Sequence, residues 1–355
     1  MKIRRLIEAL AGGGEIADED LQILVELNNP EDTAYLLAAA DRVRRQRVGN
    51  AVHLRGLIEF SNHCRANCLY CGLRRDNAMA RRYRLPLDEI EAVIANARAL
   101  GYGTVVLQSG EDSWFDAERI ARLVRYAKDL GLAVTLSLGE RDPLELAHWR
   151  RAGADRYLLR HETADPGLHQ TLRPGRSLAA RAGILATLKE LDYQTGTGFM
   201  VGLPGQTASS LVDDLKLARK FEADMVGIGP FIPHPETPLA AARGGTVMQT
   251  LKMVALARLL LPEALIPATT AIGSLDPVGR ERALTAGANV VMPSLTPTEF
   301  RSRYLLYPGK ICLDETAAHC RGCLEGRIRR LGRTVAAGPG HSPRWERRRD
   351  NDANT

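Results

Sequence analysis

Short apolar runs alternate with longer helix-like stretches over most of the chain. Eight apolar runs lie at 52–60, 104–110, 133–139, 156–163, 195–202, 225–231, 265–273 and 289–295. Between them, apolar positions recur with the period of a helix, as in 87–101 and 116–131, and both of these stretches end in glycine. Alternating strands and helices predict an α/β fold with a parallel sheet whose strands are buried on both faces.

The number of runs decides between two parallel architectures. Eight strands alternating with helices favour a (β/α)8 TIM-type barrel, and the lack of a clean dinucleotide-binding fingerprint argues against the competing doubly wound open sheet. We expect a helical N-terminal extension at 1–50, the barrel at 51–300, a C-terminal cap at 301–335 and a disordered basic tail at 336–355.

Polar residues gather where each predicted strand ends, which is where barrel enzymes carry their chemistry. Residues 64–71 follow the first run, and 108–112 the second. The ends of later runs supply Thr135, Ser137, Glu140, Arg160, His161, Glu162, Thr269 and Thr270. A barrel interior is ordinarily filled by Val, Ile and Leu, so paired hydroxyls inside it indicate a polar or anionic ligand, although threonine is also a good strand former.

Composition and charge narrow the class of protein. The chain has 355 residues, of which 45% are hydrophobic and 25% charged, and no apolar window is long enough to cross a membrane. Charged residues interrupt the N-terminus before a signal sequence forms, so we expect a cytoplasmic protein. Residues 326–355 carry eight arginines against three acidic residues, a charge that would suit binding to nucleic acid. We interpret this end instead as a solvated tail, and we expect no nucleic-acid partner.

The six cysteines fall into two triplets: Cys64, Cys68 and Cys71 at spacing Cys-x3-Cys-x2-Cys, and Cys312, Cys320 and Cys323 at spacing Cys-x7-Cys-x2-Cys. In a reducing compartment clustered cysteines indicate metal ligands rather than disulfides. Three thiolates hold one corner of a 4Fe-4S cube and leave one iron open to another ligand. Zinc completed by His63 or His53 at the first set, or by His319 at the second, is the alternative.

The first triplet, with Tyr70 before its last cysteine, resembles the signature of the radical S-adenosylmethionine (SAM) superfamily. The resemblance implies that the open iron binds SAM, whose reductive cleavage gives a 5′-deoxyadenosyl radical. "QSGED" lies where that superfamily has a Gly-Gly-Glu segment that contacts the methionyl amine. This chain departs from that pattern by having Gln108 and Ser109 before the glycine.

Further segments, among them "RYLLRHETADPGLH", "GLPGQT", "GIGPFIPHPETPLA", "IPATTA" and "LYPGKIC", resemble the HydE family, which matures the active site of FeFe hydrogenase. The resemblance implies that Glu162 and Arg181 contact SAM, that the segment with Met200 lies against the adenine, and that Arg160 lies nearer the substrate. Tyr304 has two interpretations. It either packs as an ordinary core residue or closes the top of the cavity beside the cofactor. Thr135, Ser137, Thr269 and Thr270 are the other substrate candidates.

The resemblance also implies cofactors and partners. The second triplet would bind an accessory iron–sulfur cluster, 2Fe-2S or 4Fe-4S, that the radical step does not need. The substrate would be a small organometallic iron–cysteine complex with CO and cyanide, made by HydG. HydF and an electron donor such as a ferredoxin or flavodoxin would be further partners. A radical mutase or synthase like methylornithine synthase or biotin synthase, and a zinc-binding adaptor that binds nucleic acid, are the alternatives.

Overall fold

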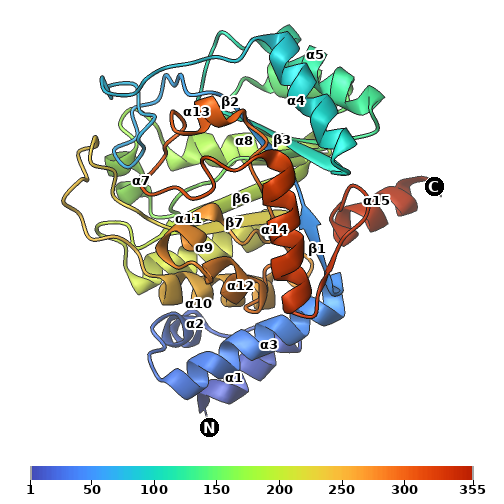
Figure 1. Cartoon of the computed structure of the whole chain (residues 1–355). Coiled ribbons are helices and arrows are strands. Elements are labelled where there is room, and N and C mark those ends of the chain that lie inside the picture. Colours follow the sequence, from blue (N-terminus) through green and yellow to red (C-terminus); the bar gives the residue numbers. More distant parts are fainter. Residues whose placement is uncertain (1, 354–355) are drawn as a thin grey trace.

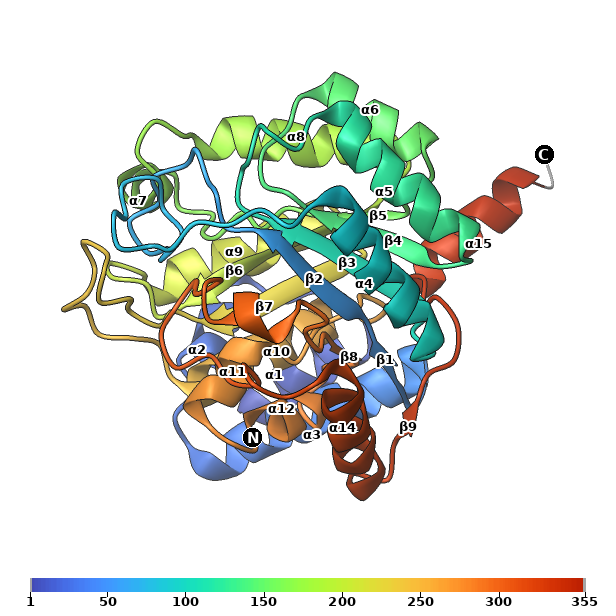
Figure 2. The ribbon, with the colours of Figure 1, turned by 45° about the horizontal axis from the view of Figure 1, so that its top comes forward.

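The structure is a computed structural model, and it describes residues 2–353. A parallel sheet forms its centre, with helices outside it (Figures 1 and 2). The strands are β1 (Ala51–Leu54), β2 (Gly56–Ser61), β3 (Thr104–Ser109), β4 (Ala133–Ser137), β5 (Arg156–Leu158), β6 (Gln194–Val201), β7 (Met225–Pro230), β8 (Val290–Val291) and β9 (Thr334–Val335).

Helices precede, separate and follow the strands. They are α1 (Lys2–Ala11), α2 (Asp18–Val25), α3 (Pro30–Val48), α4 (Leu87–Ala99), α5 (Ala117–Asp129), α6 (Pro143–Arg151), α7 (Pro166–Leu172), α8 (Leu178–Glu190), α9 (Ala208–Lys220), α10 (Val247–Leu260), α11 (Thr270–Leu275), α12 (Gly279–Leu284), α13 (Thr298–Arg301), α14 (Ala317–Arg330) and α15 (Pro343–Ala353). Side-chain caps fix several of these starts, as where Thr207 and Ser210 form a capping box at α9.

Parallel pairing runs in the order β2-β3-β4-β5-β6-β7, and a smaller sheet has the order β8-β1-β9. Single parallel bridges join the two: Met225 pairs with Leu265, Pro267 with Val290, and Leu57 with Ser294. The pairing therefore passes from β7 through residues 265–267 and β8 back to β1 and β2. This α/β architecture is the TIM-type barrel that the alternation predicts.

The region expected to be the seventh strand, 265–273, differs from the prediction. Only bridges are present at Leu265 and Pro267, and the chain turns into α11 at Thr270. Gly273 has no side chain to obstruct this turn, since a Cβ there would lie 3.0 Å from Cδ1 of Ile311. Thr270 is thus the first residue of a helix rather than a strand residue.

The N- and C-terminal segments pack on the outside of the barrel. Residues 2–48 form α1 to α3, and α3 lies against α10, which is buried around most of its circumference. Residues 343–353 form α15, although we expected disorder from 336 onward. Trp345 explains the difference, because it is 3% exposed and its indole nitrogen donates to Asp192 Oδ1 at 3.1 Å. The proposed boundaries between extension, barrel and cap stay a prediction.

Candidate active site

The first cysteine set lies on the loop between β2 and α4, at the carboxyl end of the barrel strands. Each of its sulfurs accepts a hydrogen bond. The backbone N–H groups of Glu111 and Leu73 donate to Cys64 and Cys71, both at 3.4 Å, and Arg173 Nε donates to Cys68 at 3.5 Å. Burial raises the pKa of Cys64 and of Cys71. Because buried thiolates need such donors and a positive counter-charge, this environment fits sulfurs that bind a metal cluster.

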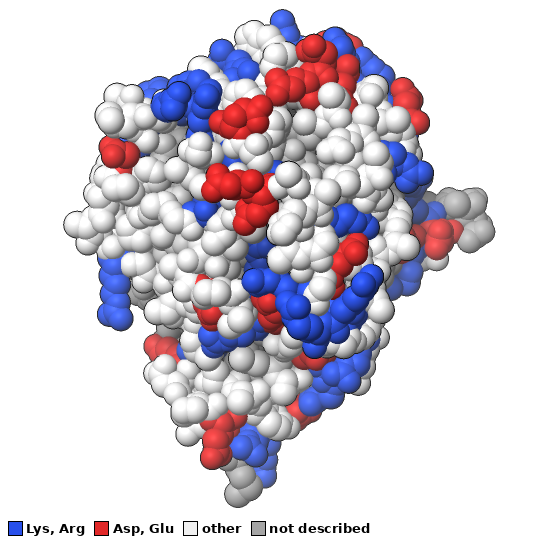
Figure 3. Space-filling view, in the orientation of Figure 1, with Lys and Arg blue, Asp and Glu red and all other residues white. Residues whose placement is uncertain are grey.

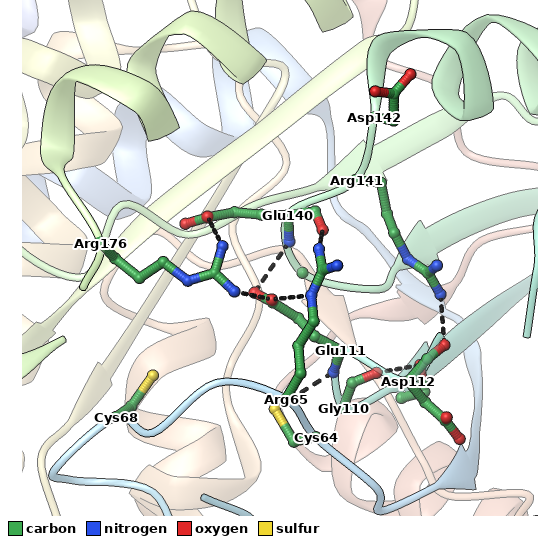
Figure 4. Close-up of polar contacts among 12 residues, drawn as sticks. Cys64, Arg65, Cys68, Gly110, Glu111, Asp112, Glu140, Arg141, Asp142 and Arg176 are labelled. Atoms are coloured by element: carbon green, nitrogen blue, oxygen red, sulfur yellow. Dashed lines mark hydrogen bonds and ion pairs between the residues drawn. The ribbon is translucent and has the colours of Figure 1, made fainter. Parts of the chain in front are cut away.

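Two glutamates and four arginines form an ion-pair network beside this loop. Figure 4 shows both glutamates with Arg65 and Arg176. Glu111 and Glu140 follow β3 and β4, while Arg65, Arg173, Arg176 and Arg181 surround them. Arg176 donates to both carboxylates, at 2.8 Å to Glu111 and 2.6 Å to Glu140. The network has two more positive than negative groups, so it places a net positive charge next to three thiolates.

Glu140 is the centre of the network. Its carboxylate accepts from Arg173 at 3.1 Å, from Arg176 at 2.6 Å and from Arg181 at 3.1 Å. Burial alone would raise the pKa of Glu140, but Arg181, Arg173 and Arg176 more than offset it, so the pKa lies below its ordinary value. Sequence reasoning noted Glu140 only as a polar residue at a strand end, and Arg173 and Arg176 were missed. Their position in the helical segment between β5 and β6 gave no periodic signal.

The residues predicted to bind SAM lie in contact with one another in smaller groups. Tyr70 packs on the apolar cluster that contains Met200. Gln108 Nε2 donates to the hydroxyl of the buried Tyr304 at 3.3 Å. Ser109 donates to the carbonyl of Gly110 at 2.7 Å.

Arg181, which we expect to contact SAM, links two other residues of the site. Its guanidinium donates to Glu140 and, at 2.6 Å, to the carbonyl oxygen of Arg160. Glu162 has a positive φ of 70° and bridges to Phe199, so it is not in the extended strand that we expected. Its carboxylate nevertheless lies 3.3 Å from Arg160 Nη2. The residues at this point form the chain of contacts Glu140–Arg181–Arg160–Glu162.

Among the predicted site residues, the buried atoms Thr135 Oγ1, Thr269 Oγ1 and Arg160 Nε have no hydrogen-bond partner in the described part of the chain, and Arg160 Nη2 and Glu162 Oε2 have only the ion pair between them. Buried polar groups are nearly always hydrogen-bonded in native proteins, so unpartnered ones indicate a ligand. The other two substrate candidates, Ser137 and Thr270, are half-buried. Ser137 is the last residue of β4, and Thr270 is the first residue of α11.

The second cysteine set combines a loop with a helix. Cys312 has a positive φ of 62° and lies 4.0 Å from Arg280 Nη2, while Cys320 and Cys323 lie on α14, where Cys320 is buried and Cys323 exposed. A hydrogen bond with Cys320 and the charge of Arg280 lower the pKa of Cys312 to about 6. Within residues 2–353 no three His, Cys, Asp or Glu side chains converge as the ligands of a single ion.

The fold and the three-thiolate loop define a radical SAM enzyme. A family model for the radical SAM superfamily matches residues 58–218. The FeFe hydrogenase maturase subunit HydE of Thermotoga maritima is 53% identical over 90% of this chain and 92% of that protein. A 3-methylornithine synthase of Methanosarcina barkeri is 33% identical over 80% of this chain and 81% of its own length.

Solved structures agree with the fold. That of methylornithine synthase (PylB) has a TM-score of 0.81 and 29% identity, and covers 99% of this chain and 100% of its own. That of HydG also has a TM-score of 0.81, covering 98% of this chain and 77% of its own, but is 15% identical and supports the fold alone.

The chain therefore belongs to the HydE family of FeFe hydrogenase maturases within the radical SAM superfamily. Membership implies a 4Fe-4S cluster and SAM as cofactors, and it confirms the predicted enzyme over the zinc-binding adaptor. Of the helices in the described part of the chain, none has the length and hydrophobicity that a membrane crossing requires.

Proposed function

We propose that this enzyme acts on an iron–cysteine complex bearing CO and cyanide, in the assembly of the di-iron subcluster of the FeFe-hydrogenase active site. The observation that supports this substrate is the set of buried groups that other side chains leave free or only partly paired: the Thr135 and Thr269 hydroxyls, which have no hydrogen-bond partner, and the Arg160 guanidinium, which pairs with Glu162 through Nη2 alone. A guanidinium and two hydroxyl donors suit a small anion better than an apolar substrate.

The position of two of these groups is fixed by glycines of β7. A Cβ at Gly229 would lie 3.2 Å from Thr269 Oγ1, and one at Gly227 would lie 3.8 Å from Arg160 Cδ. Both side chains therefore approach the same strand, which carries no side chain at either position. A ligand held by Thr269 and Arg160 would meet backbone rather than side chains on that side.

The chain's own residues then have the following roles. Cys64, Cys68 and Cys71 hold the 4Fe-4S cluster, and the SAM site is lined by Tyr70, Gln108, Ser109, Glu162, Arg181, Met200 and Tyr304. When bound, the cluster and SAM supply a 5′-deoxyadenosyl radical by one-electron cleavage of the sulfonium. Thr135, Ser137, Arg160, Thr269 and Thr270 bind and orient the substrate.

The remaining partners belong to the same proposal. Cys312, Cys320 and Cys323 hold an accessory iron–sulfur cluster. A HydG-type enzyme supplies the substrate, a HydF-type protein receives the product, and a ferredoxin or flavodoxin supplies electrons.

In vitro maturation of apo-hydrogenase with and without this protein tests the function. Hydrogenase activity should depend on the protein, and Thr269→Val combined with Thr135→Val should lower it strongly while SAM cleavage persists. Thr285→Val, at an exposed position after α12, is the matched control. Maturation that proceeds equally well without the protein would refute the proposal.

A radical mutase or synthase on a small organic substrate is the second candidate, as in biotin synthase or methylornithine synthase. It is favoured by the 33% identity to a 3-methylornithine synthase and by the TM-score of 0.81 to another. The two candidates separate by the organic product that this protein forms with SAM and a reductant. Formation of a methylornithine would favour the second candidate over the first.

A further inference from the structure

The surface of the loop that carries the first cysteine set is strongly basic. Residues 61–84 contain six arginines against a single acidic residue, Asp76, a net charge of +5. Arg75, Arg81 and Arg84 are exposed. Figure 3 shows basic side chains at the upper left, over the segment between β2 and α4. We call Arg75, Met79, Arg81, Arg84 and Trp114 the loop face.

Buried contacts hold this loop in place without Arg75 and Arg81. Arg82 donates to the carbonyl oxygens of Asn62, Leu73 and Arg74, at 2.6, 3.0 and 2.7 Å. Asn77 donates to the carbonyl of Gly72 at 2.7 Å, and Arg84 donates to the buried Asp112 carboxylate at 2.7 and 3.0 Å. The fold of the loop thus rests on Arg82, Asn77 and Arg84.

Arg75 and Arg81 contribute little to this framework. Arg75 pairs only with its neighbour Asp76, and the Arg81 side chain makes no hydrogen bond or ion pair among residues 2–353. An exposed ion pair contributes at most about 1 kcal/mol, so stability does not account for these charges.

Two large apolar side chains, Met79 and Trp114, are exposed among the residues of the loop face. Met79 is 71% exposed and lies between Asn77 and Arg81 in the loop. Trp114 is 40% exposed, and the guanidiniums of Arg84 and Arg119 lie 5.9 and 4.5 Å from its ring centre. Methionine, tryptophan and arginine are the residue types enriched at protein–protein interfaces, where they form an apolar centre with a charged rim.

The loop face lies on the same short segment as the metal ligands. Leu73, whose N–H donates to Cys71, adjoins Arg74 and Arg75 in the chain. A protein docked here would therefore contact the segment that holds the cluster. The proposed function needs one electron per SAM cleavage from an outside donor, and such a donor has to approach the cluster closely.

We propose that the loop face is the docking surface for an acidic one-electron carrier protein. The carrier loses one electron to the cluster and dissociates oxidised, with no bond formed or broken between the proteins. The arginines at the rim attract the acidic carrier and raise the association rate. Met79 and Trp114 form the apolar contact that excludes water from the interface. This inference rests on the proposed function, because only a radical SAM reaction needs the electron. Binding of the carrier can nevertheless be measured whether or not SAM is cleaved.

The test uses a flavodoxin and the reconstituted protein, with Arg75→Glu combined with Arg81→Glu. Binding, measured by calorimetry, should weaken about 10-fold at low salt, and its dependence on ionic strength should flatten. Flavodoxin-driven formation of 5′-deoxyadenosine should fall in parallel, while dithionite-driven formation stays unchanged.

Arg329→Glu combined with Arg330→Glu is the matched control, because these two arginines are exposed on α14 beside the second cysteine set. It should bind flavodoxin like the unaltered protein. If the α14 variant loses binding and the loop-face variant does not, the docking site is wrong. If dithionite fails to drive SAM cleavage in the unaltered protein, the proposed function fails instead, and the binding result still decides the docking surface.

Discussion

The two cysteine sets contain the same kind of ligand in different surroundings. At the first set a separate N–H group donates to each sulfur, and a network with an excess of two positive charges lies beside the loop. At the second set, Arg280 Nη2 lies 4.0 Å from the Cys312 sulfur, Arg301 donates to the Cys312 carbonyl rather than to a sulfur, and Cys323 is exposed. Spacing alone does not distinguish these environments.

Secondary structure explains the difference. The first set lies on one irregular loop, so its sulfurs can meet donors from that loop (Leu73 N–H), from the segment after β3 (Glu111 N–H) and from the Arg173 side chain. In the second set, Cys320 and Cys323 lie three residues apart on α14, where backbone N–H groups are used within the helix. A set at the mouth of the barrel is thus built into the catalytic site, while the second is built into the cap.

The largest expected difference between the two sets is in SAM cleavage. Cys68→Ala should abolish formation of 5′-deoxyadenosine, because two thiolates no longer hold the first cluster. Cys320→Ala should leave most of the activity and remove only the iron bound at the second set. Iron content and product formation after anaerobic reconstitution measure both effects. Equal losses in the two variants would contradict the division into a catalytic and an accessory set.

The electrostatic contrast predicts the next largest effect, on stability. Glu140→Gln leaves three buried or half-buried arginines without their shared carboxylate, so the free energy of unfolding should fall by about 3–5 kcal/mol. Glu325→Gln on α14 removes a carboxylate whose partners are more exposed, and it should change the free energy by about 0.5 kcal/mol or less. Urea denaturation measures both, and similar losses would refute the contrast.

Much of the molecule follows from the sequence, and the exceptions have physical causes. The buried strands β3, β4, β6 and β7 lie where apolar runs predict them, because hydrophobic burial fixes such strands. Resemblance located the first cysteine set. The pairing of Arg173 and Arg176 with Glu140 was not predictable, because ion pairs between distant segments leave no periodic pattern. Thr270 was misplaced because short apolar runs do not separate a strand from a buried helix turn.

A buried ion pair joins the barrel to the cap, and it predicts a smaller effect. Lys310 Nζ lies 2.5 Å from Glu59 Oε1 and also donates to the carbonyl of Tyr304 at 3.3 Å. Lys310→Met leaves the Glu59 carboxylate buried without its cation, so unfolding free energy should fall by about 3 kcal/mol. Adding Glu59→Gln should recover about 2 kcal/mol of this loss. A double-mutant cycle in urea gives the coupling, and simple additivity of the two changes would show that the pair is not coupled.

The smallest expected effect concerns the one side-chain donor in the first set. Arg173 Nε donates to Cys68 at 3.5 Å while Nη1 donates to Glu140 at 3.1 Å, and a lysine, which has a single nitrogen, cannot reproduce both contacts. Hydrogen bonds to cluster sulfurs stabilise the more negative, reduced state. Arg173→Lys should therefore make the reduction potential of the first cluster slightly more negative at nearly unchanged iron content. Arg280→Lys, next to Cys312, should leave that potential unchanged, and potentiometric titration followed by electron paramagnetic resonance compares the two. A shift of the first cluster's potential in the Arg280 variant but not in the Arg173 variant would overturn the assignment of Arg173 as the donor that tunes the barrel-mouth site.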